Sequence, residues 1–508
     1  MLLVLLVAAF AWRLVGLTAQ SLWRDEVDVI WLAIRPLRET ISMFISPAQN
    51  GPLYFLLMRP WLQNAGTTEF ALRYSSVLFG VLAIPLLWQV ARLLAPGDGR
   101  PGLGDTPTLA ALLLAVHPYH LWYSQEGKMY SLVVVLTLLS TWSWLKAMQR
   151  GGPWRWLTYL LVTSISIYTH LMTALILPVH FVWFLLVHPL NRRRWLGYGL
   201  TASGFVLPYI PLIWWQWHYL TTLDYQTGYS FTPFVDVVRV LLLDHTGLAL
   251  AGLDLVWTVP VLFLALAGLL VGPGEFTEPA PEDGLAALRG VRRVTMLAVW
   301  LLLPVLLIHG VSLIKPIFVD RYVIWIGPAF LILVALGLRV LAHSGGRAAY
   351  LLGVLLTVFL IGLWLRNGWV QTHTPNKTQL REAVHYIAER RTPEQVLILQ
   401  IPHAHYAYRY YTSDFGEDPF EDSDARLEPW AEGLWTHNAL STAEAMAQVE
   451  QDMARITAGH PEAWVLLTEA SSWDPRGLML RWLDEHATLE EQRAFHGVEV
   501  RRYRLERR

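Results

Sequence analysis

The sequence contains no cysteine, few charged residues and no excess of positive charge. Among its 508 residues, 16% are charged and 54% are hydrophobic, and the formal net charge is -1. The lack of cysteine excludes disulfide bonds and thiolate metal sites. Soluble domains carry about 25% charged residues, so this composition indicates a polytopic membrane protein. The near-neutral net charge gives no indication of a nucleic-acid partner.

Long apolar runs dominate the first two thirds of the chain. They fall at 1–19, 70–95, 107–118, 128–148, 155–171, 172–189, 196–217, 252–271, 294–314, 322–342 and 348–366. We therefore predict a polytopic α-helical membrane protein with about eleven transmembrane helices, because most of these runs can cross the hydrocarbon core. The first run lacks a basic n-region and a small-residue cleavage site, so we expect a retained helix rather than a signal peptide.

The loops between the runs predict the orientation. One alternating set is rich in arginine, with the sequences GDGRPGLGDT, QRGGPWR, NRRRW, LRGVRR and AHSGGR. The positive-inside rule places this set in the cytoplasm. The other set, which includes the long loops 20–69 and 218–251, then faces the extracytoplasmic side of the cell (cytoplasmic) membrane.

The last third of the chain has a different character. From about Asn367 it is polar, with helical stretches such as KTQLREAVHYIAERR and RGLMLRWLDEH and strand-like stretches such as QVLILQI and VEVRRYRLE. Mixed helical and strand patterns are typical of an α/β domain. We predict two domains: a transmembrane domain over 1–366 and a small extracytoplasmic α/β domain over 367–508.

Acidic residues crowd the exit of the first apolar run, in the stretch QSLWRDEVDVIWLAI. On a helix, Asp25 and Asp28 would share one face, whereas Glu26 would point about 100° away from Asp25. The two adjacent acids are therefore expected to serve different partners. The alternative is that these acids complement the dipole at the start of a helix.

At two other predicted outer loops, cations occur near a helix start, where the helix dipole disfavours them. In HPYHLWYSQEGKMYSL, Ser124 is a plausible N-cap, which would put Glu126 and Lys128 in the first turn of a membrane helix. The helix dipole repels a lysine there, and an anionic ligand would explain it. Snorkelling of the lysine to the headgroups is the alternative. In KPIFVDRY, Lys315 and Arg321 lie before and at the start of the next such entry, which favours one shared anionic ligand. The alternative is that Asp320 pairs with one of these cations.

These stretches, taken in order, resemble bacterial family 39-like glycosyltransferases of the GT-C membrane class. The ordered set is QSLWRDEV, NGPLYFLLMRPW, EFALRYSSVLFGVLAIPLL, HPYHLWYSQEGKMYSL, IYTHLMTALIL and KPIFVDRYVIWIGPAFLIL, over roughly residues 1–345. Many relatives have His-Pro-Pro where this chain has Asn50-Gly51-Pro52, so any role of that histidine does not carry over.

The resemblance implies an inverting transfer of one sugar, a hexosyl or pentosyl group, from a polyprenyl-phosphate donor. The acceptor would be a protein, a glycolipid or a glycan on the outer face of the membrane. By resemblance Asp25 is the base, Glu26 positions a sugar, and Glu126 is a second carboxylate of the cavity. The cations expected to hold the donor phosphate are Lys128, Arg321 and Lys315. Further residues expected around the cavity are Asp28, His170, Tyr123 and Gln125.

The resemblance also implies two structural features and leaves the cofactor open. Residues 51–64 are expected to form a short interfacial helix, and the loop 218–251 to lie over the site. Some GT-C enzymes use a divalent metal and others do not; no residue of this chain is assigned as a metal ligand.

Two other function classes fit a many-helix membrane protein. A transporter or flippase of a lipid-linked sugar also has many spans, although its charges usually lie near the midplane and often in repeated halves. A receptor or assembly scaffold would use 367–508 to bind a partner. The charges here collect on one face and no internal repeat is present, which favours the enzyme.

Overall fold

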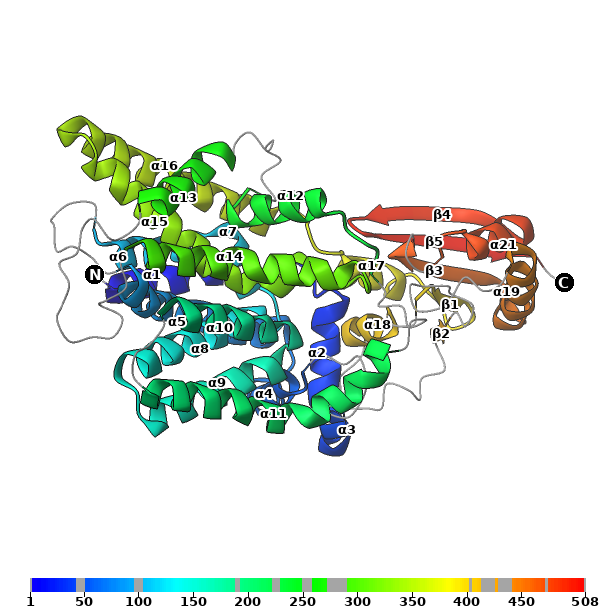
Figure 1. The fold of residues 1–508 in the computed structure, drawn as a ribbon. Helices are drawn as coiled ribbons and strands as arrows, with labels where there is room; N and C mark the ends of the chain where they lie inside the picture. The colour runs from blue at the N-terminus through cyan, green and yellow to red at the C-terminus, as the bar shows by residue number, and fades with distance from the viewer. Residues whose placement is uncertain are drawn as a thin grey trace.

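The computed structural model describes residues 2–42, 51–95, 104–187, 192–221, 229–248, 258–271, 290–401, 404–412, 425–427, 441–470 and 474–506. These residues form a helical body and a C-terminal mixed α/β part (Figure 1). In this view the helical body is a bundle, and α2 (Arg24–Ile34) runs across the end of the bundle that faces the C-terminal part.

The body follows the order of the predicted apolar runs. Its first helices are α1 (Leu2–Leu14), α2, α3 (Leu37–Ser42), α4 (Leu53–Ala65), α5 (Glu69–Leu94), α6 (Thr106–Val116), α7 (Pro118–Ser124), α8 (Tyr130–Arg150) and α9 (Pro153–Thr169). The chain continues with the 3-10 helix η1 (Leu171–Leu175), α10 (Ile176–Val187), α11 (Arg192–Thr221), α12 (Phe234–His245), α13 (Val259–Val271) and α14 (Gly290–Ser312). The 3-10 helix η4 (Asp320–Ile326), α15 (Gly327–His343) and α16 (Gly346–His373) complete the body.

Each of the predicted runs contains a helix, and the chain is a mostly helical membrane protein. Within the described residues, 5 helices are long and apolar enough to cross a membrane. They are Glu69–Leu94, Tyr130–Arg150, Arg293–Ser312, Asp320–His343 and Gly346–His373. Several other runs, such as Leu2–Leu14 and Thr106–Val116, form shorter apolar helices. The predicted number of about eleven full spans, which assumed ~30 Å of hydrocarbon for each, therefore stays a prediction. The short helix expected at 51–64 is present as α4.

One local prediction was wrong. Ser124 does not cap the helix that contains Glu126 and Lys128, because it is the last residue of α7 and its hydroxyl donates to His120 O at 2.6 Å. Pro118 starts this separate short helix, and α8 begins only at Tyr130. Glu126 and Lys128 therefore lie in a tight turn between two helices, where Lys128 N donates to Glu126 O at 2.8 Å.

Glycines let α13 and α15 approach each other closely. A Cβ atom on Gly337 would lie 1.8 Å from the backbone oxygen of Leu264, and one on Gly268 would lie 2.1 Å from that of Leu333. Such close approach of small residues is a common means of packing helices in membranes. It fixes α15, and with it the η4 segment that begins at Asp320.

We predict that Gly337→Ala destabilises the protein whereas Gly362→Ala does not. Both glycines are helical, so alanine raises helix propensity at each by about 1 kcal/mol. A Cβ on Gly362 meets no atom within 4 Å, but one on Gly337 overlaps the α13 backbone. The midpoint of thermal unfolding in detergent should fall for Gly337→Ala only. Equal midpoints for the two variants would contradict the close packing.

The C-terminal part is a five-stranded sheet in the order β2-β1-β3-β5-β4 with helices around it. Its strands are β1 (Val396–Leu399), β2 (Ala425–Leu427), β3 (Glu462–Thr468), β4 (Ala487–Phe495) and β5 (Val498–Leu505). Its helices include α17 (Leu380–Ala388), α18 (Ala404–Thr412), α19 (Thr442–Thr457) and α21 (Leu478–His486). Strands β1, β2 and β3 are parallel, and β5 pairs antiparallel with β3 and β4. The sequence patterns predicted α17, β1, α21 and β5, but not β3, β4 or α19.

The C-terminal part is attached to the loop that precedes α2. Ser21 Oγ donates to Thr378 O at 2.7 Å, and Leu22 N donates to the Tyr411 hydroxyl at 2.7 Å. The Trp31 and Tyr406 rings pack with their centroids 5.4 Å apart. These contacts hold α2 between the helical body and the C-terminal part, so both parts determine where its acids point.

Candidate active site

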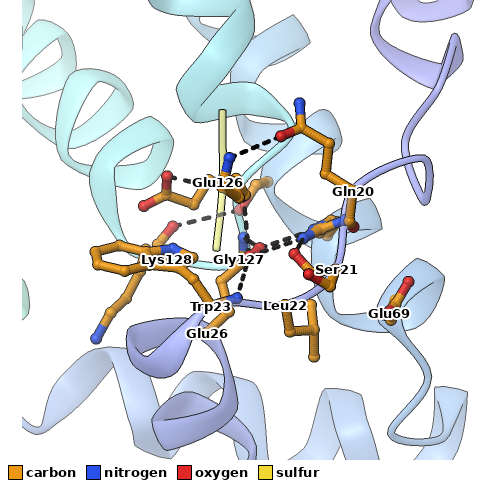
Figure 2. A network of polar contacts seen from close by, with 12 residues as sticks. Gln20, Ser21, Leu22, Trp23, Glu26, Glu69, Glu126, Gly127 and Lys128 are labelled. Carbon is orange, nitrogen blue, oxygen red and sulfur yellow. Dashed lines mark hydrogen bonds and ion pairs between the residues drawn. The ribbon is translucent and has the colours of Figure 1, made fainter. Parts of the chain in front are cut away.

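Glu26 is a fully buried carboxylate with five hydrogen-bond donors around it, one of which is the backbone N–H of Trp23 at 3.5 Å from Oε2. Arg73 of α5 donates Nε to Oε1 and Nη2 to Oε2, each at 2.8 Å. Lys377 Nζ lies 3.0 Å from Oε2, and the backbone N–H of Gly127 lies 2.7 Å from Oε1 (Figure 2). Burial raises the pKa of Glu26, but Arg73 and Lys377 outweigh it and lower the pKa to about 2. The carboxylate therefore ties three distant segments of the chain together.

Arg73 extends this anchor into the loop that leads to α2. Its side chain is 1% exposed, and its remaining N–H groups donate to the backbone oxygens of Leu17, Gln20 and Ser21 at 2.7–2.9 Å. All guanidinium donors are thus used within the protein. The loop before Asp25 is therefore held through its main-chain oxygens.

Glu126 lies beside this cluster. Its Oε2 is 3.9 Å from Lys377 Nζ, and the residue is 2% exposed. Burial raises the pKa of Glu126 to about 7; Lys377 opposes the rise and the charge of Glu26 adds to it. Burial also lowers the pKa of Lys377, against the attraction of Glu26. The cluster therefore holds two acids of very different proton affinity.

Asp25 points away from this cluster toward Arg321. Its Oδ2 is 3.8 Å from Arg321 Nη2, and its Oδ1 is 3.6 Å from Arg24 Nε. The side chains of Asp25 and Arg321 are 19% and 22% exposed, so both are accessible. Burial raises the pKa of Asp25, but the charges of Lys128, Arg24 and Arg321 together lower it below the ordinary aspartate value. Asp25 is therefore an ionised carboxylate among cations.

Lys128 and Asp28 complete the surroundings of Asp25. Burial raises the pKa of Asp28 to about 6; the charge of Lys128 opposes the rise and that of Asp25 adds to it. Lys128 thus influences both aspartates on one face of α2, as the spacing of Asp25 and Asp28 predicted. The turn that carries Lys128 is the one whose Gly127 N–H binds Glu26 (Figure 2).

Arg321 sits among aromatic rings. Its Nε donates to the Tyr130 hydroxyl at 2.9 Å, and its guanidinium carbon lies 5.6 Å from the Trp23 ring centroid and 5.9 Å from that of Tyr322. Rings at this distance attract a cation and restrict its rotation. Arg321 therefore lies among these rings with its Nη2 atom toward Asp25.

The other predicted site residues fall in different places. Gln125 is used within the fold, since its Nε2 donates to Val15 O at 2.8 Å and its Oε1 accepts from Thr372. His170 is buried between the rings of Tyr130 and Tyr322, with centroids 6.0 and 4.8 Å away. Lys315 is buried in the loop after α14. The structure brings Asp25, Lys128 and Arg321 together and leaves the role of Lys315 a prediction.

A cavity of about 230 Å³ is lined in part by Asp320, the residue that precedes Arg321 in the chain. Its lining includes Tyr119, Tyr123 and Asp320, and both tyrosine hydroxyls lie 3.4 Å from Asp320 Oδ2. Asp320 therefore faces these hydroxyls, although the sequence suggested a neighbouring cation as its partner. Asp244 of α12 also lines the cavity. It belongs to the loop 218–251, which was expected to lie over the site.

Sequence reasoning missed Arg73, Lys377 and Asp244. Arg73 lies in a long apolar run, and a buried arginine there is a signal that a paired acid exists elsewhere. Lys377 and Asp244 lie in polar stretches with many similar residues, so nothing in their spacing marks them.

The side chains around Asp25 do not form a binding site for a metal ion. Its oxygens face arginines rather than further carboxylates or imidazoles. Among the described residues, no group of three or more His, Cys, Asp or Glu side chains could hold a metal. The mechanism proposed for this site therefore uses no metal ion.

We predict that Glu26→Gln lowers the free energy of unfolding by roughly 3–5 kcal/mol, because Arg73 and Lys377 lose a buried counter-charge. The wild type should lose the same stabilisation with acid. Since folding lowers the pKa of Glu26 to about 2, the stabilisation is complete above the unfolded pKa of about 4.3 and declines as the pH falls toward 2. The measurement is the thermal unfolding midpoint against pH. Glu39→Gln, at an exposed residue of α3, is the control, and a Glu26→Gln midpoint equal to that of the control would refute the anchor.

Known proteins resemble the chain in sequence over one segment and in fold over its whole length. Residues 49–215 match the family model described as dolichyl-phosphate-mannose-protein mannosyltransferase. No curated protein matches the sequence.

Two solved structures resemble nearly the whole chain. One is ArnT from Cupriavidus metallidurans bound to undecaprenyl phosphate, with 12% identity and a TM-score of 0.56, covering 98% of this chain and 97% of that one. The other is the oligosaccharyltransferase AglB from Archaeoglobus fulgidus in complex with an inhibitory peptide and a dolichol-phosphate, with 12% identity and a TM-score of 0.55, covering 98% and 74%. The chain therefore has the fold of the GT-C membrane glycosyltransferases, which confirms the resemblance drawn from its ordered motifs.

Proposed function

We propose that the chain is an inverting glycosyltransferase that moves one sugar from a polyprenyl-phosphate donor to an acceptor on the outer face of the cytoplasmic membrane. The observation that carries this is an ionised, accessible Asp25 held beside Arg321 and Lys128. A base next to two cations suits a reaction in which a proton leaves the acceptor while charge grows on a phosphate. The two solved relatives were captured with polyprenyl phosphates, which supports the donor class.

In this mechanism Asp25 takes the proton of the acceptor hydroxyl or amine as that atom attacks the anomeric carbon. The bond from the anomeric carbon to the phosphate oxygen breaks on the opposite face, so the configuration inverts. The departing phosphate keeps the bonding electron pair, and Arg321 and Lys128 stabilise its charge. Because the same cations lower the pKa of Asp25 in the free protein, their engagement by phosphate would restore the basicity of Asp25 when the donor is bound.

Glu26 and Glu126 act indirectly in this proposal. Glu26 is enclosed and its oxygens accept from Arg73, Lys377 and Gly127, so it holds the first turn of α2 in place rather than contacting a sugar. Glu126 belongs to the same cluster. The rigidity of this cluster sets the distance from Asp25 to the phosphate-binding cations, and small displacements of a catalytic group are costly.

We predict that Asp25→Asn lowers sugar transfer roughly 10²- to 10⁴-fold, the usual contribution of a general base. The assay follows a labelled polyprenyl-phosphate sugar in detergent, where a transporter has no compartment to fill and would give no product. Asp28→Asn, on the same face of α2, is the comparison and should lose much less. Full activity of Asp25→Asn would contradict the assignment of the base.

We predict that Arg321→Gln weakens use of the donor by roughly 10- to 100-fold in kcat/KM, because a hydrogen bond to a charged group contributes about 1.5–3 kcal/mol. Arg321→Lys should recover part of the loss, since it restores the charge but not the planar fork. Arg347→Gln, at an exposed position of α16, is the matched control. An unchanged donor KM with a raised acceptor KM would move Arg321 to the acceptor side of the site.

A further inference from the structure

The cavity that Asp320 lines combines aromatic walls with polar side chains. At about 230 Å³ it is smaller than the 300–1,000 Å³ pockets that hold drug-sized ligands. It therefore has room for one ring rather than a chain of rings. Trp122 and Tyr123 supply aromatic walls, and the polar lining includes Asp244, Gln371 and Asn376.

The amide groups of the lining are oriented by the backbone. Gln371 Nε2 donates to Pro118 O at 2.8 Å, and Asn376 Nδ2 donates to Gln371 O at 2.9 Å. Each amide nitrogen donates to a main-chain oxygen, which orients the amide and leaves its oxygen and its second N–H available to a ligand.

Asp244 adds an acceptor that lacks a partner within the protein. The residue is 6% exposed, and among the described residues no hydrogen-bond donor meets its Oδ2. A buried carboxyl oxygen without a hydrogen-bond partner is unfavourable, so a ligand that donates a hydrogen bond to it would be stabilised. Burial raises the pKa of Asp244 to about 8, and the charge of Asp320 adds to the rise.

We propose that this cavity seats a single hydroxyl-rich ring of the monosaccharide class. The ring hydroxyls donate to the oxygens of Asp244, Gln371 and Asn376, and one ring face lies against the aromatic wall. This proposal rests on the proposed function, because the ring is either the sugar of the donor or a sugar of the acceptor. Asp320 joins the cavity to the reaction centre, since it precedes Arg321 in the chain and faces Tyr123.

A direct binding measurement tests the cavity without any reaction. The full-length protein in detergent is examined by saturation-transfer NMR with free mannose, glucose and arabinose as probes. We expect ring-proton signals from at least one probe, and binding roughly 5- to 100-fold weaker in Asp244→Ala, the range of one or two lost hydrogen bonds. The matched control is Asp236→Ala, at an exposed residue of the same helix α12, which should bind like the wild type. Asn376→Ala, at a half-buried position, provides a second variant if Asp244→Ala does not fold.

Kinetic measurements on Asp244→Ala then distinguish a donor sugar from an acceptor sugar in the cavity. If the cavity holds the donor sugar, Asp244→Ala lowers both transfer and the acceptor-free hydrolysis of the donor. If it holds an acceptor sugar, transfer falls through a raised acceptor KM while donor hydrolysis stays unchanged. No signal from any probe with the wild type, or equal binding by Asp244→Ala and Asp236→Ala, would overturn the proposal. Probe binding by a wild type that never transfers sugar would instead contradict the proposed function.

Discussion

The structure depends on one buried ionic contact, between Glu26 and its partners Arg73 and Lys377. The residues come from α2, α5 and the segment after α16, so the contact joins the region after α1, the helical body and the start of the C-terminal part. Desolvating such charges is expensive, and the cost is met here by hydrogen bonds to every guanidinium donor of Arg73 and by the Gly127 N–H. A contact of this kind stabilises little beyond an apolar equivalent, but it permits only one arrangement of the segments.

This constraint explains why the C-terminal part matters to a site that lies on the helical body. Lys377 neutralises Glu26 from a segment that the sequence assigns to the second domain. Glu469, after β3, pairs with Arg24 at 3.0 Å, next to Asp25, and has a positive φ of 50° that non-glycine residues rarely adopt. Strained backbone of this kind persists where surrounding contacts enforce it. The C-terminal part is therefore better regarded as a wall of the site than as an appended module.

Much of the fold and part of the site were predictable from sequence, for different physical reasons. Apolar runs predicted the helices because burial in lipid imposes length and composition together. The cations Lys128 and Arg321 were detectable because a positive charge near a helix start is unfavourable without a partner. The start of α8 was misplaced because Ser124 suits both an N-cap and a helix end, and only the packing of α7 decides. Lys377 and Asp244 could not be found, since their importance arises from which distant groups they meet.

One small region of the protein holds acids of different proton affinity. Asp25 and Asp28 are on one face of α2, yet the pKa of Asp25 is lowered and that of Asp28 is raised to about 6. The difference follows from position, because Arg24 and Arg321 contact Asp25 directly whereas burial dominates at Asp28. Acids whose environments move their pKa values apart can divide the roles of base and proton reservoir. A donor phosphate would draw Arg321 away from Asp25, so occupancy of the site itself would raise the proton affinity of the base at the moment it is required.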